Sequence, residues 1–465
     1  MVVVGGGLAG LAAAVALAEE GFRVCLLEKR PHLGGRATSY ALPNGEEVDN
    51  CQHVTLGCCT NLSDFYRRAG AAGKIRFYER LFFLDTRGHR GVIEPAGFAA
   101  PLHLAPSFVL FPSLGFADKR GVARAMLHIA WSGGRPPGVK GVSMLAWLRD
   151  MQQTEAAIER FWRTVLVSAL NEELDRTDAV YGVEVFWKAF LANRGGFAVG
   201  IPVVPLAELY DGCRAPIERR GGEVRTRAGV KSLRLVGDKV TGVTLEDGTA
   251  MQADYVISAL PHWGFLDLMP AAQLDREPAF AGVRNLETSP ITGVHFWLDR
   301  TVMQEPFLTL LDRTTQWIFN KTLLSAQPGS SATPAPAGGQ YLQLVISASY
   351  DLVPRSRQEI ISLCLRELHE AIPASRAARL EKATVIKEVN ATFSPRPGSD
   401  RWRPSQGTSL KGFFLAGDWT RTGWPATMEG AVRSGYLAAE AILTAEGSHR
   451  RLIVPDLPLE GLVRL

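Results

Sequence analysis

The chain opens with Met1-Val-Val-Val-Gly-Gly-Gly-Leu-Ala-Gly10. The apolar run before the glycines predicts a buried strand, and the Ala-rich residues 8–20 predict a helix. Gly5, Gly7 and Gly10 occupy the three glycine positions of a dinucleotide-binding turn. In such a turn the first glycine makes the bend, the second admits a pyrophosphate and the third allows close helix packing. The opening segment therefore predicts a strand, a phosphate-binding turn and a helix.

A second apolar run, residues 22–27, ends at Glu28, which lies 18 residues after the last of these glycines. Strand, helix, strand and acid together form a βαβ dinucleotide-binding pattern, in which the acid accepts the ribose hydroxyls. Leu8 and Ala9 begin the helix, whose N-terminus faces the phosphates. We expect these residues, with Lys29 directly after the acid, to contact the dinucleotide. A glycine-rich turn that serves only packing is the alternative.

A second glycine pair, Gly34 and Gly35, is followed by Arg36. This arrangement resembles the two-dinucleotide-binding-domain flavoproteins of the amine oxidase and phytoene desaturase superfamily. The resemblance implies FAD rather than NAD, with the glycines closing over the cofactor and Arg36 approaching its phosphates. It also implies that Val230 pairs its backbone with the adenine. The alternatives are a plain turn with a solvated arginine and an ordinary strand valine.

The other end of the chain carries a matching pattern. Residues 412–416 predict a short buried strand, and residues 429–443 predict a helix whose small side chains permit close packing. The N-terminal amides of that helix point where an anion would sit. In the resembling superfamily, a Gly-Asp pair after the strand contacts the ribityl chain and pyrophosphate, and the start of the helix touches the isoalloxazine. The residues carried over in this way are Gly417, Asp418, Thr427, Met428 and Glu429.

The sequence thus predicts an α/β fold of two domains: a discontinuous Rossmann-like (GR2-type) FAD-binding domain and an α+β substrate domain. The expected FAD-binding segments are 1–75, 205–265 and 400–445, the substrate segments are 76–204 and 266–399, and a tail covers 446–465. Further elements are expected as helices at 142–151 and 156–169, and as strands at 222–235, 240–245, 253–260, 292–298, 316–321 and 341–348, with a hairpin turn at Asp247-Gly248. Residues 326–340, rich in Pro, Gly, Ser and Ala, predict a mobile hairpin insertion without chemistry.

Three segments make the resemblance more specific. They are Asp49-Asn-Cys-Gln-His53, Gln316-Trp-Ile-Phe-Asn-Lys321 and Leu415-Ala-Gly-Asp-Trp-Thr-Arg-Thr-Gly-Trp-Pro-Ala-Thr-Met-Glu-Gly-Ala-Val-Arg-Ser-Gly435. Over nearly its whole length the chain resembles the squalene-associated FAD enzymes of bacterial hopanoid synthesis, the hydroxysqualene dehydroxylases. One departure is Cys51, which stands where glycine is expected. A cysteine needs extra room there, and a small buried thiol usually behaves as an inert hydrophobe.

The resemblance implies removal of the allylic hydroxyl of hydroxysqualene, with reduced FAD supplying hydride and squalene as the product. Hydroxide is a poor leaving group, so a general acid should protonate it. His53 is the leading candidate because it titrates near neutrality, and its alternative role is to hold a carbonyl or the cofactor. Asp49 is the second candidate, and its alternative role is to fix its loop through hydrogen bonds to backbone amides.

The longest stretch without Asp, Glu, Lys or Arg is residues 95–117. Pro101, Pro106 and Pro112 interrupt it, so a membrane-spanning helix is not expected. A loop-rich apolar wall fits a hydrophobic polyisoprenoid substrate, since each buried methylene contributes about 0.8 kcal/mol. Five side chains are predicted to line a substrate tunnel or its membrane-facing mouth, with plain core as the alternative: Phe98, Leu102, Phe108, Phe111 and Phe116.

Composition narrows the partners and the compartment. A formal net charge of +4 without a long basic run gives no reason to expect nucleic acid, although attraction to an anionic membrane stays open. The six cysteines have neither the spacing of a zinc site nor the density of a disulfide scaffold, so no metal is expected. Because the predicted strand follows Met1 directly, we expect no signal peptide. We expect a cytoplasmic protein, with peripheral contact to the inner membrane face as an option.

Three other functions stay open. The cofactor motifs do not encode redox direction, so a carotenoid-type polyene desaturase is the nearest rival. A flavin amine oxidase would need an aromatic cage or a carboxylate in a small pocket, and we find no motif for either. A non-catalytic flavin-bearing scaffold for squalene-synthesising enzymes is the third. Motifs of serine hydrolases, zinc peptidases and P-loop proteins are absent from the sequence.

Overall fold

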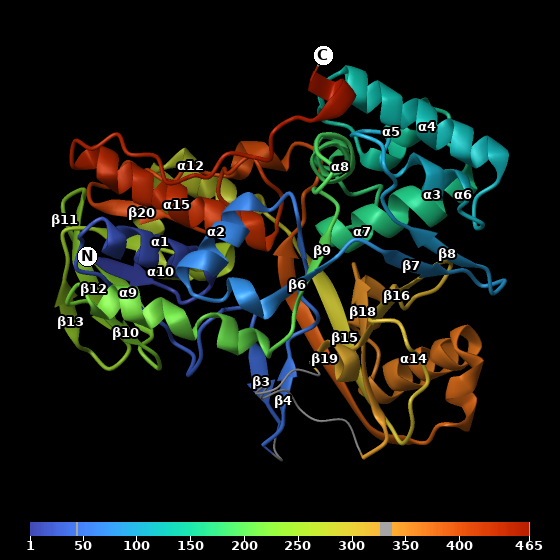
Figure 1. Ribbon diagram of the computed structural model, residues 1–465. Coiled ribbons are helices and arrows are strands. Elements are labelled where there is room, and N and C mark those ends of the chain that lie inside the picture. The colour runs from blue at the N-terminus through green and yellow to red at the C-terminus, as the bar shows by residue number, and fades with distance from the viewer. Residues whose placement is uncertain (43–44, 326–336, 465) are drawn as a thin grey trace.

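The structure, a computed structural model, describes residues 1–42, 45–325 and 337–464. Figure 1 shows two parts: one is built on a parallel sheet to which both ends of the chain contribute, and the other combines a larger sheet with a group of helices. The predicted α/β class, with a Rossmann-like part and an α+β part, is confirmed. The exact residue limits of the two domains stay a prediction.

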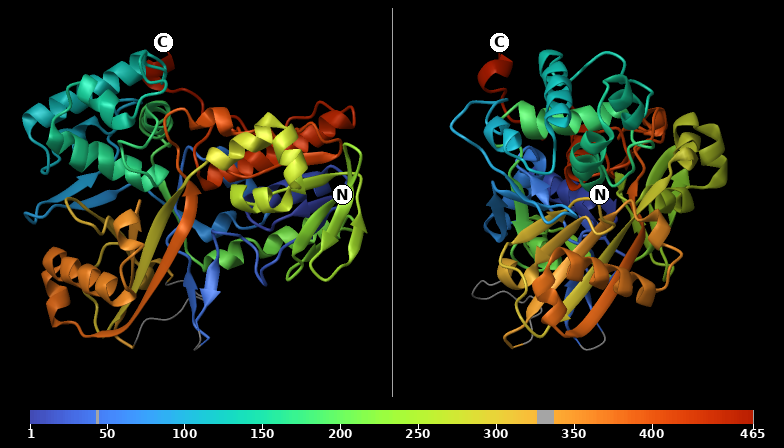
Figure 2. Two further views of the ribbon diagram at one scale, coloured as in Figure 1. Left: turned by 180° about the vertical axis from the view of Figure 1, so that it is seen from behind. Right: turned by 90° about the vertical axis from the view of Figure 1, so that its right-hand side faces the viewer.

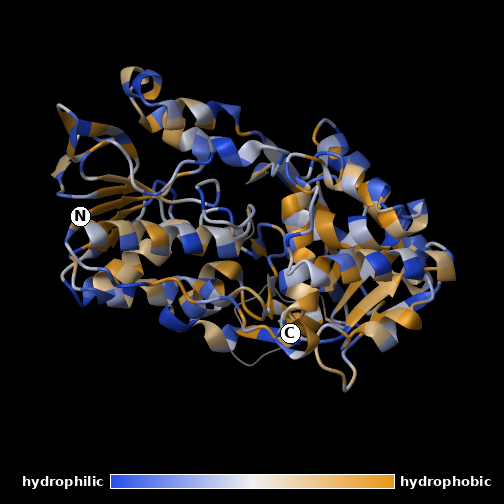
Figure 3. Cartoon of the chain, turned by 90° about the horizontal axis from the view of Figure 1, so that it is seen from above, coloured by the Kyte–Doolittle hydropathy of each residue, from blue (hydrophilic) through white to orange (hydrophobic). Residues whose placement is uncertain are grey.

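The parallel sheet has five strands in the order β10-β2-β1-β14-β20. Its side chains alternate between two cores, so Val3 packs against one face while Val2 and Val4 pack against the other. Both faces are covered, which explains why the strands are apolar throughout; Figure 3 shows them orange beside the N-terminus. The strands are β1 (Val2–Val4), β2 (Cys25–Leu27), β10 (Glu223–Arg225), β14 (Val256–Ser258) and β20 (Phe413–Leu415).

Helices from the two ends of the chain lie side by side on one face of this sheet. They are α1 (Leu8–Glu19), blue in Figure 1, and α15 (Met428–Ala445), red in the same view. Gly435 makes the close contact: a Cβ there would lie 2.3 Å from the Ala9 carbonyl oxygen and 2.9 Å from the Ala13 amide nitrogen. Only glycine permits this distance, because the atoms that a side chain would meet belong to the backbone.

We expect Gly435→Ala to lower the free energy of unfolding by about 1–3 kcal/mol, the usual cost of overpacking a filled interior. Thermal unfolding of the protein with its cofactor measures this. Gly264→Ala is the matched control, because Gly264 lies inside helix α10 (His262–Leu268) and a Cβ there would meet its nearest atom only at 3.4 Å. Alanine there should be neutral or stabilise by about 0.5–1 kcal/mol. Equal stabilities of the two variants would contradict the close contact between α1 and α15.

A three-stranded antiparallel sheet lies against the opposite face of the parallel sheet. It consists of β11 (Val230–Val236), β12 (Lys239–Leu245) and β13 (Ala250–Gln252). The predicted turn lies between β12 and β13, where Gly248 has a φ of +87°. The predicted strand over residues 222–235 is in fact two strands in different sheets, because residues 226–229 carry the chain from β10 to β11.

The main sheet of the second part has seven strands in the order β19-β15-β18-β17-β16-β7-β8. Figure 2 shows its two longest strands, in yellow and orange, running from the parallel-sheet part to the far side of the molecule. The predicted strands over residues 292–298, 316–321 and 341–348 are confirmed as β15, β17 and β18. The strands are β7 (Leu81–Leu84), β8 (Arg90–Ile93), β15 (Thr288–Leu298), β16 (Phe307–Leu310), β17 (Trp317–Asn320), β18 (Gln340–Ser347) and β19 (Leu380–Phe393), and helix α14 (Arg357–Ala371) packs on one face.

A group of helices completes the second part around an aromatic core that includes Trp147, Trp162 and Phe186. The predicted helices over 142–151 and 156–169 are confirmed, the second as α6 and α7 joined through wider turns at Ile158–Arg163. The helices are α3 (Ala105–Val109), α4 (Phe116–Trp131), α5 (Met144–Asp150), α6 (Glu155–Ala157), α7 (Thr164–Leu170) and α8 (Ala179–Phe186).

Smaller elements complete the fold. Strands β5, β6 and β9 form one antiparallel sheet, and β3 pairs with β4. These elements are β3 (Ser39–Ala41), β4 (Glu47–Asp49), β5 (Thr55–Leu56), α2 (Thr60–Arg68), β6 (Ile75–Tyr78), β9 (Val199–Pro202), α9 (Arg214–Glu218), α11 (Ala271–Arg276), α12 (Pro278–Gly282) and α13 (Lys321–Leu324). Most of the predicted insertion, residues 326–336, lies outside the described residues. Within the described ranges, no helix has both the length and the apolar character needed to cross a bilayer.

Candidate cofactor and substrate site

The carboxyl ends of the central parallel strands bring the opening and closing motifs to one edge of the sheet. Val4 of β1 pairs with Ser258 of β14, which in turn pairs with Leu415 of β20. Gly5 follows β1 and Gly417 lies shortly after β20, so the chain leaves the sheet at this edge in both motifs. In open parallel sheets, this is the edge where ligands bind.

The three fingerprint glycines differ in what surrounds them. Gly5 has a φ of +107°, which glycine adopts without strain. A Cβ on Gly10 would lie 2.0 Å from the Gly5 carbonyl oxygen, so the approach of the helix to the turn requires glycine. A Cβ on Gly7 would meet its nearest atom, the Cα of Gly35, only at 3.8 Å. The protein itself therefore has room for a Cβ at Gly7, and the bare backbone there fits a closely approaching phosphate.

The second glycine pair lies over the first motif. The amide of Gly34 donates a hydrogen bond of 2.8 Å to the carbonyl of Gly6, and Gly35 lies beside the second fingerprint glycine. Leu8 and Ala9 form the first turn of α1, where the N-cap glycine has no side chain to occupy the amides. Those amides and the positive end of the helix favour an anion at this point.

Glu28 lies at the same turn. It is buried, and its carboxylate accepts hydrogen bonds of 2.7 Å from the amides of Gly6 and Arg30. The Glu28 carbonyl accepts a further bond from the amide of Ala228, which places the start of β11 and its first residue, Val230, next to the acid. The acid and the predicted adenine-contacting valine are thus close together.

The two basic residues predicted to bind the cofactor have different partners. Arg36 is half-buried, donates to the carbonyl of Ala391 at 2.7 Å and forms an ion pair of 2.8 Å with Asp418. This ion pair joins the opening motif to the closing motif. Lys29 is exposed and forms an ion pair of 2.8 Å with Glu246, so its ammonium is at the surface.

The closing motif is ordered by hydrogen bonds of its own. Gly417 has a φ of +142°, and its amide donates to the hydroxyl of Ser434 at 2.7 Å. Thr427 is the N-cap of α15 and accepts a bond from the amide of Gly430 at 3.0 Å. Met428 follows with its sulfur 3.9 Å from a tyrosine hydroxyl of α2, and its side chain lines an apolar cavity. The start of α15 is therefore held rigidly at the edge of that cavity.

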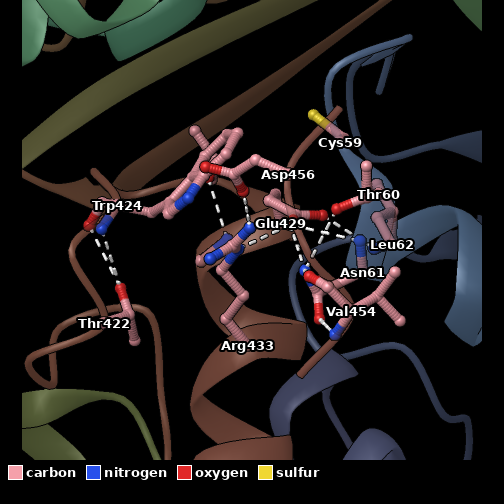
Figure 4. A network of polar contacts seen from close by, with 12 residues as sticks. Cys59, Thr60, Asn61, Leu62, Thr422, Trp424, Glu429, Arg433, Val454 and Asp456 are labelled. Atoms are coloured by element: carbon pink, nitrogen blue, oxygen red, sulfur yellow. Dashed lines mark hydrogen bonds and ion pairs between the residues drawn. The ribbon is translucent and has the colours of Figure 1, made fainter. Parts of the chain in front are cut away.

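Glu429 has a role that the sequence did not indicate. Its carboxylate is fully buried and accepts bonds from the amide of Leu62 at 2.7 Å, from the amide of Asn61 at 3.2 Å and from the Asn61 side chain at 3.0 Å (Figure 4). It also pairs with Arg433 at 2.7 Å. Because these amides belong to the first turn of α2, Glu429 supplies the negative charge that a helix N-terminus favours.

A charged network surrounds the indole of Trp424. Arg433 lies 4.9 Å and Lys188 lies 5.1 Å from the ring centroid, so the ring contacts two cations. Both cations also pair with Asp456 of the C-terminal tail (Figure 4 shows the Arg433 pair). Lys188 has a second partner, Glu184, at 3.4 Å. Burial raises the pKa of the Glu184 carboxyl, and Lys188 offsets only part of that rise.

The segment that contains both predicted catalytic residues is tied to β17 and α13 by a buried ion pair. Asp49 accepts from Lys321 at 2.9 Å, from Ser39 at 2.9 Å and from the amide of Leu206 at 3.0 Å. Lys321 also donates to Gln52 at 3.1 Å. Burial alone would raise the pKa of the Asp49 carboxyl, but Lys321 and the other donors together lower it. Asp49 therefore stays ionised and fully bonded at neutral pH.

His53 is half-buried, and its Nδ1 lies 3.4 Å from the carbonyl of Cys51. Burial lowers the pKa of the imidazole, and the nearby carbonyl and carboxylate only partly counteract this. The ring is consequently neutral at neutral pH, which leaves little imidazolium to donate a proton. The next residue, Val54, lines the cavity.

Cys51 fits because the strand beside it carries a glycine. Its φ is +58°, a left-handed conformation that explains why glycine is expected at this position. Its sulfur lies 2.8 Å from the point where a Cβ on Gly293 of β15 would stand, so Gly293 provides the extra room. Burial, the largest influence, together with nearby carboxylates raises the pKa of the thiol to about 12. The thiol is therefore protonated at neutral pH.

We expect Gly293→Ala to destabilise the protein by about 1–3 kcal/mol, because the new methyl group would clash with the Cys51 sulfur. Cys51→Gly alone should change the free energy of unfolding by less than about 1 kcal/mol. Glycine relieves the left-handed strain at this position, and this offsets the larger backbone entropy that glycine loses on folding. The double variant should recover most of the loss. Chemical denaturation of all four proteins gives the coupling energy, and strictly additive effects would contradict the contact.

A cavity of about 440 Å³ lies among the helices of the second part, and segments 54–62 and 424–429 complete its wall. Its lining is mainly apolar, and the charged side chains on it are Arg160, Glu184, Lys188 and Glu429. Three of the five predicted tunnel residues line it, namely Leu102, Phe108 and Phe111. The other two do not: Phe98 is 55% and Phe116 is 83% exposed, because the chain turns their side chains outward at the loop and at the start of α4.

Sequence reasoning missed several of these residues. Lys321 ends one of the segments that carry the resemblance, but its buried ion pair becomes visible only in the fold. Glu184 and Lys188 could have been found from the sequence, because they are two opposite charges four residues apart in an otherwise apolar helical run. Asp456 was assigned only to a tail, because its partners lie far away in the sequence.

Comparison with known proteins gives consistent matches. Residues 8–443 match the family described as flavin containing amine oxidoreductase. The chain is 27% identical over 467 residues to the 15-cis-phytoene desaturase of Solanum lycopersicum, covering 95% of this chain and 77% of that protein. It is 25% identical over 471 residues to the zeta-carotene desaturase of Synechocystis sp., with 95% and 96% covered.

Solved structures share the fold. An oxidoreductase from Methanosarcina mazei superposes with a TM-score of 0.74 at 20% identity, covering 95% of this chain and 99% of that one. A putrescine oxidase bound to putrescine superposes with a TM-score of 0.69 at 15% identity, covering 95% and 98%. At these identities the likeness concerns the fold alone.

Proposed function

The chain belongs to the family of flavin containing amine oxidoreductases and is an FAD-dependent oxidoreductase, and from that premise we propose that it converts hydroxysqualene into squalene. When bound, FAD supplies the two-electron chemistry. The residues that would hold it are the bare backbone at Gly7, the first-turn amides of α1 and the Arg36 side chain, which Asp418 fixes in place. Glu28 lies where the ribose hydroxyls of such a cofactor bind.

The single observation that carries the proposal is the apolar cavity whose wall includes the closing motif. A long hydrocarbon gains about 0.8 kcal/mol for each buried methylene, so such a lining favours a polyisoprenoid over a small polar substrate. The choice of hydroxysqualene is supported by the three segments that resemble the dehydroxylases. Two of these segments depend on each other through the Asp49–Lys321 ion pair, and the third carries Asp418 and Trp424.

Loss of the hydroxyl group requires a proton at its oxygen, and we propose Glu184 as the donor. Its side chain lines the cavity beside Lys188, and its raised pKa retains the proton closer to neutrality than an exposed glutamate would. His53 stays the second candidate, although its lowered pKa disfavours the imidazolium form. Asp49 is better suited to fixing its loop, because its oxygens are already bonded to Ser39, Lys321 and a backbone amide.

The test is a single turnover of the purified protein with its own flavin. After anaerobic photoreduction, addition of hydroxysqualene should restore the oxidised flavin absorbance and form squalene in a matching amount, detected by mass spectrometry. A reduced protein that keeps its reduced spectrum in the presence of hydroxysqualene would remove this proposal.

A carotenoid-type desaturase is the second candidate function, and the similarity to phytoene and zeta-carotene desaturases favours it. It uses the same cavity in the opposite redox direction. Incubation of the oxidised protein with phytoene should then bleach the flavin and produce a more conjugated polyene. The apolar lining argues against an amine oxidase despite the shared fold with putrescine oxidase. Turnover by the isolated protein in either assay would also exclude a purely scaffolding role beside squalene-synthesising enzymes.

A further inference from the structure

Large apolar side chains are exposed along α3 and α4. Val109 is 64%, Leu110 80%, Phe116 83% and Trp131 84% exposed. Single exposed apolar residues are ordinary, but several in one short stretch mark an interaction site. We call this region, at the upper right of Figure 1, the α3–α4 surface. Its members are Phe98, Val109, Leu110, Phe116, Leu127 and Trp131.

The apolar residues of α4 follow the period of the helix. Phe116, Leu127 and Trp131 are spaced so that they share one face, and Arg120 and Arg124 are exposed on the same side. Helix α4 turns Val122, Ala125 and Ile129 to the core, so the exposed apolar residues form a second strip that the core does not cover. Something other than the rest of the chain is therefore expected to cover it.

The α3–α4 surface is continuous with the substrate cavity. Leu102 is 42% and Leu127 is 43% exposed, and both also line the cavity. Ala123, exposed on α4, lines it as well. The cavity thus reaches the surface at the apolar region, and a hydrocarbon entering there would not need to cross a polar rim.

The charges within the chain segment that carries the α3–α4 surface are mainly positive. Residues 98–135 contain four basic side chains and one acidic side chain, Asp118. The Asp118 carboxylate accepts from the amide of Gly115 at 2.8 Å and from the hydroxyl of Thr154 at 2.5 Å, so its charge caps α4. The basic side chains are Lys119, Arg120, Arg124 and Arg135. Exposed apolar side chains flanked by Lys and Arg are typical of helices that lie at an anionic lipid interface.

We propose that the α3–α4 surface docks on an anionic phospholipid bilayer and that the cavity receives its substrate from that bilayer. The apolar side chains enter the acyl boundary while the basic ones contact the phosphate groups. The docking itself follows from exposure and charge, whereas substrate delivery rests on the function proposed above. A second copy of the chain could cover the α3–α4 surface instead, and the experiment below distinguishes a dimer from a membrane-bound protein.

Sedimentation of the FAD-loaded protein with vesicles tests the docking. Vesicles of phosphatidylcholine and phosphatidylglycerol should bind the protein, vesicles of phosphatidylcholine alone should bind it at least about tenfold more weakly, and salt should weaken binding. The double variant Leu110→Asp, Phe116→Asp should lose about tenfold or more of the affinity. Val236→Asp is the matched control, because Val236 is 70% exposed on β11 in the other part of the molecule.

Several results would overturn the proposal. The first is that the wild-type protein does not bind vesicles, and the second is that the double variant binds them equally well. The third is that the wild-type protein is a dimer that does not bind vesicles while the double variant is a monomer, which would assign the surface to a second copy of the chain. Unchanged flavin absorbance and thermal unfolding show that the variants are folded. Turnover tests substrate delivery apart from the docking. The double variant should turn over detergent-dispersed hydroxysqualene at the full rate, and its rate should fall about tenfold only when the substrate is held in vesicles. No turnover by the wild-type protein in detergent would contradict the proposed function and leave the docking result standing.

Discussion

Gly7→Val is expected to weaken FAD binding strongly and leave the protein folded. The protein itself leaves 3.8 Å between a Cβ at Gly7 and the nearest atom, which is ordinary van der Waals contact for the first carbon of the new side chain. The same side chain would occupy the space in which the pyrophosphate approaches the backbone. We expect the dissociation constant for FAD to rise at least about 100-fold, which corresponds to roughly 2.8 kcal/mol. Visible absorbance of the purified protein and titration with added FAD measure this.

Two variants give the comparison that this prediction needs. Gly73→Val is the control, because a Cβ on Gly73 meets no atom within 4 Å, and it should bind FAD normally. Gly10→Ala should damage both folding and FAD binding, because its methyl group would lie 2.0 Å from the Gly5 carbonyl oxygen. A yellow Gly7→Val protein with wild-type affinity would show that the cofactor does not approach this turn.

The parallel-sheet part could be predicted from the sequence because its signals are local. The fingerprint glycines, the apolar strand and the acid at Glu28 all lie within thirty residues, and each has a distinct backbone requirement. The small residues of α15 likewise predicted a close helix contact, which Gly435 makes. What could not be predicted was the partner, because nothing local shows that α15 meets α1.

The polar contacts of the site were beyond sequence reasoning for a similar reason. Glu429 caps α2, and Asp49 pairs with Lys321, across hundreds of residues of chain. Such contacts depend on the three-dimensional fold and leave no periodicity to detect. The outward turn of Phe98 and Phe116 was missed because an uncharged stretch does not indicate which of its apolar side chains faces solvent.

Glu184→Gln is expected to lower the rate of hydroxysqualene turnover by about 100-fold or more, the usual range for loss of a general acid. Glutamine keeps the shape of the side chain beside Lys188, but its amide group is not acidic enough to protonate the leaving hydroxyl. Because only the protonated carboxyl acts, the wild-type rate should fall as pH rises through the raised pKa of Glu184. That pH dependence should vanish in the variant. Rapid-mixing measurement of flavin reoxidation across pH gives both quantities.

His53→Gln separates the two candidate donors. Burial lowers the pKa of His53, so a rate that depended on its imidazolium would fall at a pH below the ordinary range of histidine. We expect this variant to retain the pH profile of the wild type and to lose less than about tenfold in rate. A 100-fold loss in His53→Gln, with Glu184→Gln near the wild-type rate, would transfer the role to the histidine. The FAD content of both variants is the control, and equal content shows that a change in rate does not come from loss of the cofactor. For Glu184→Gln we expect equal content, because Glu184 on α8 and its partner Lys188 lie away from the fingerprint turn.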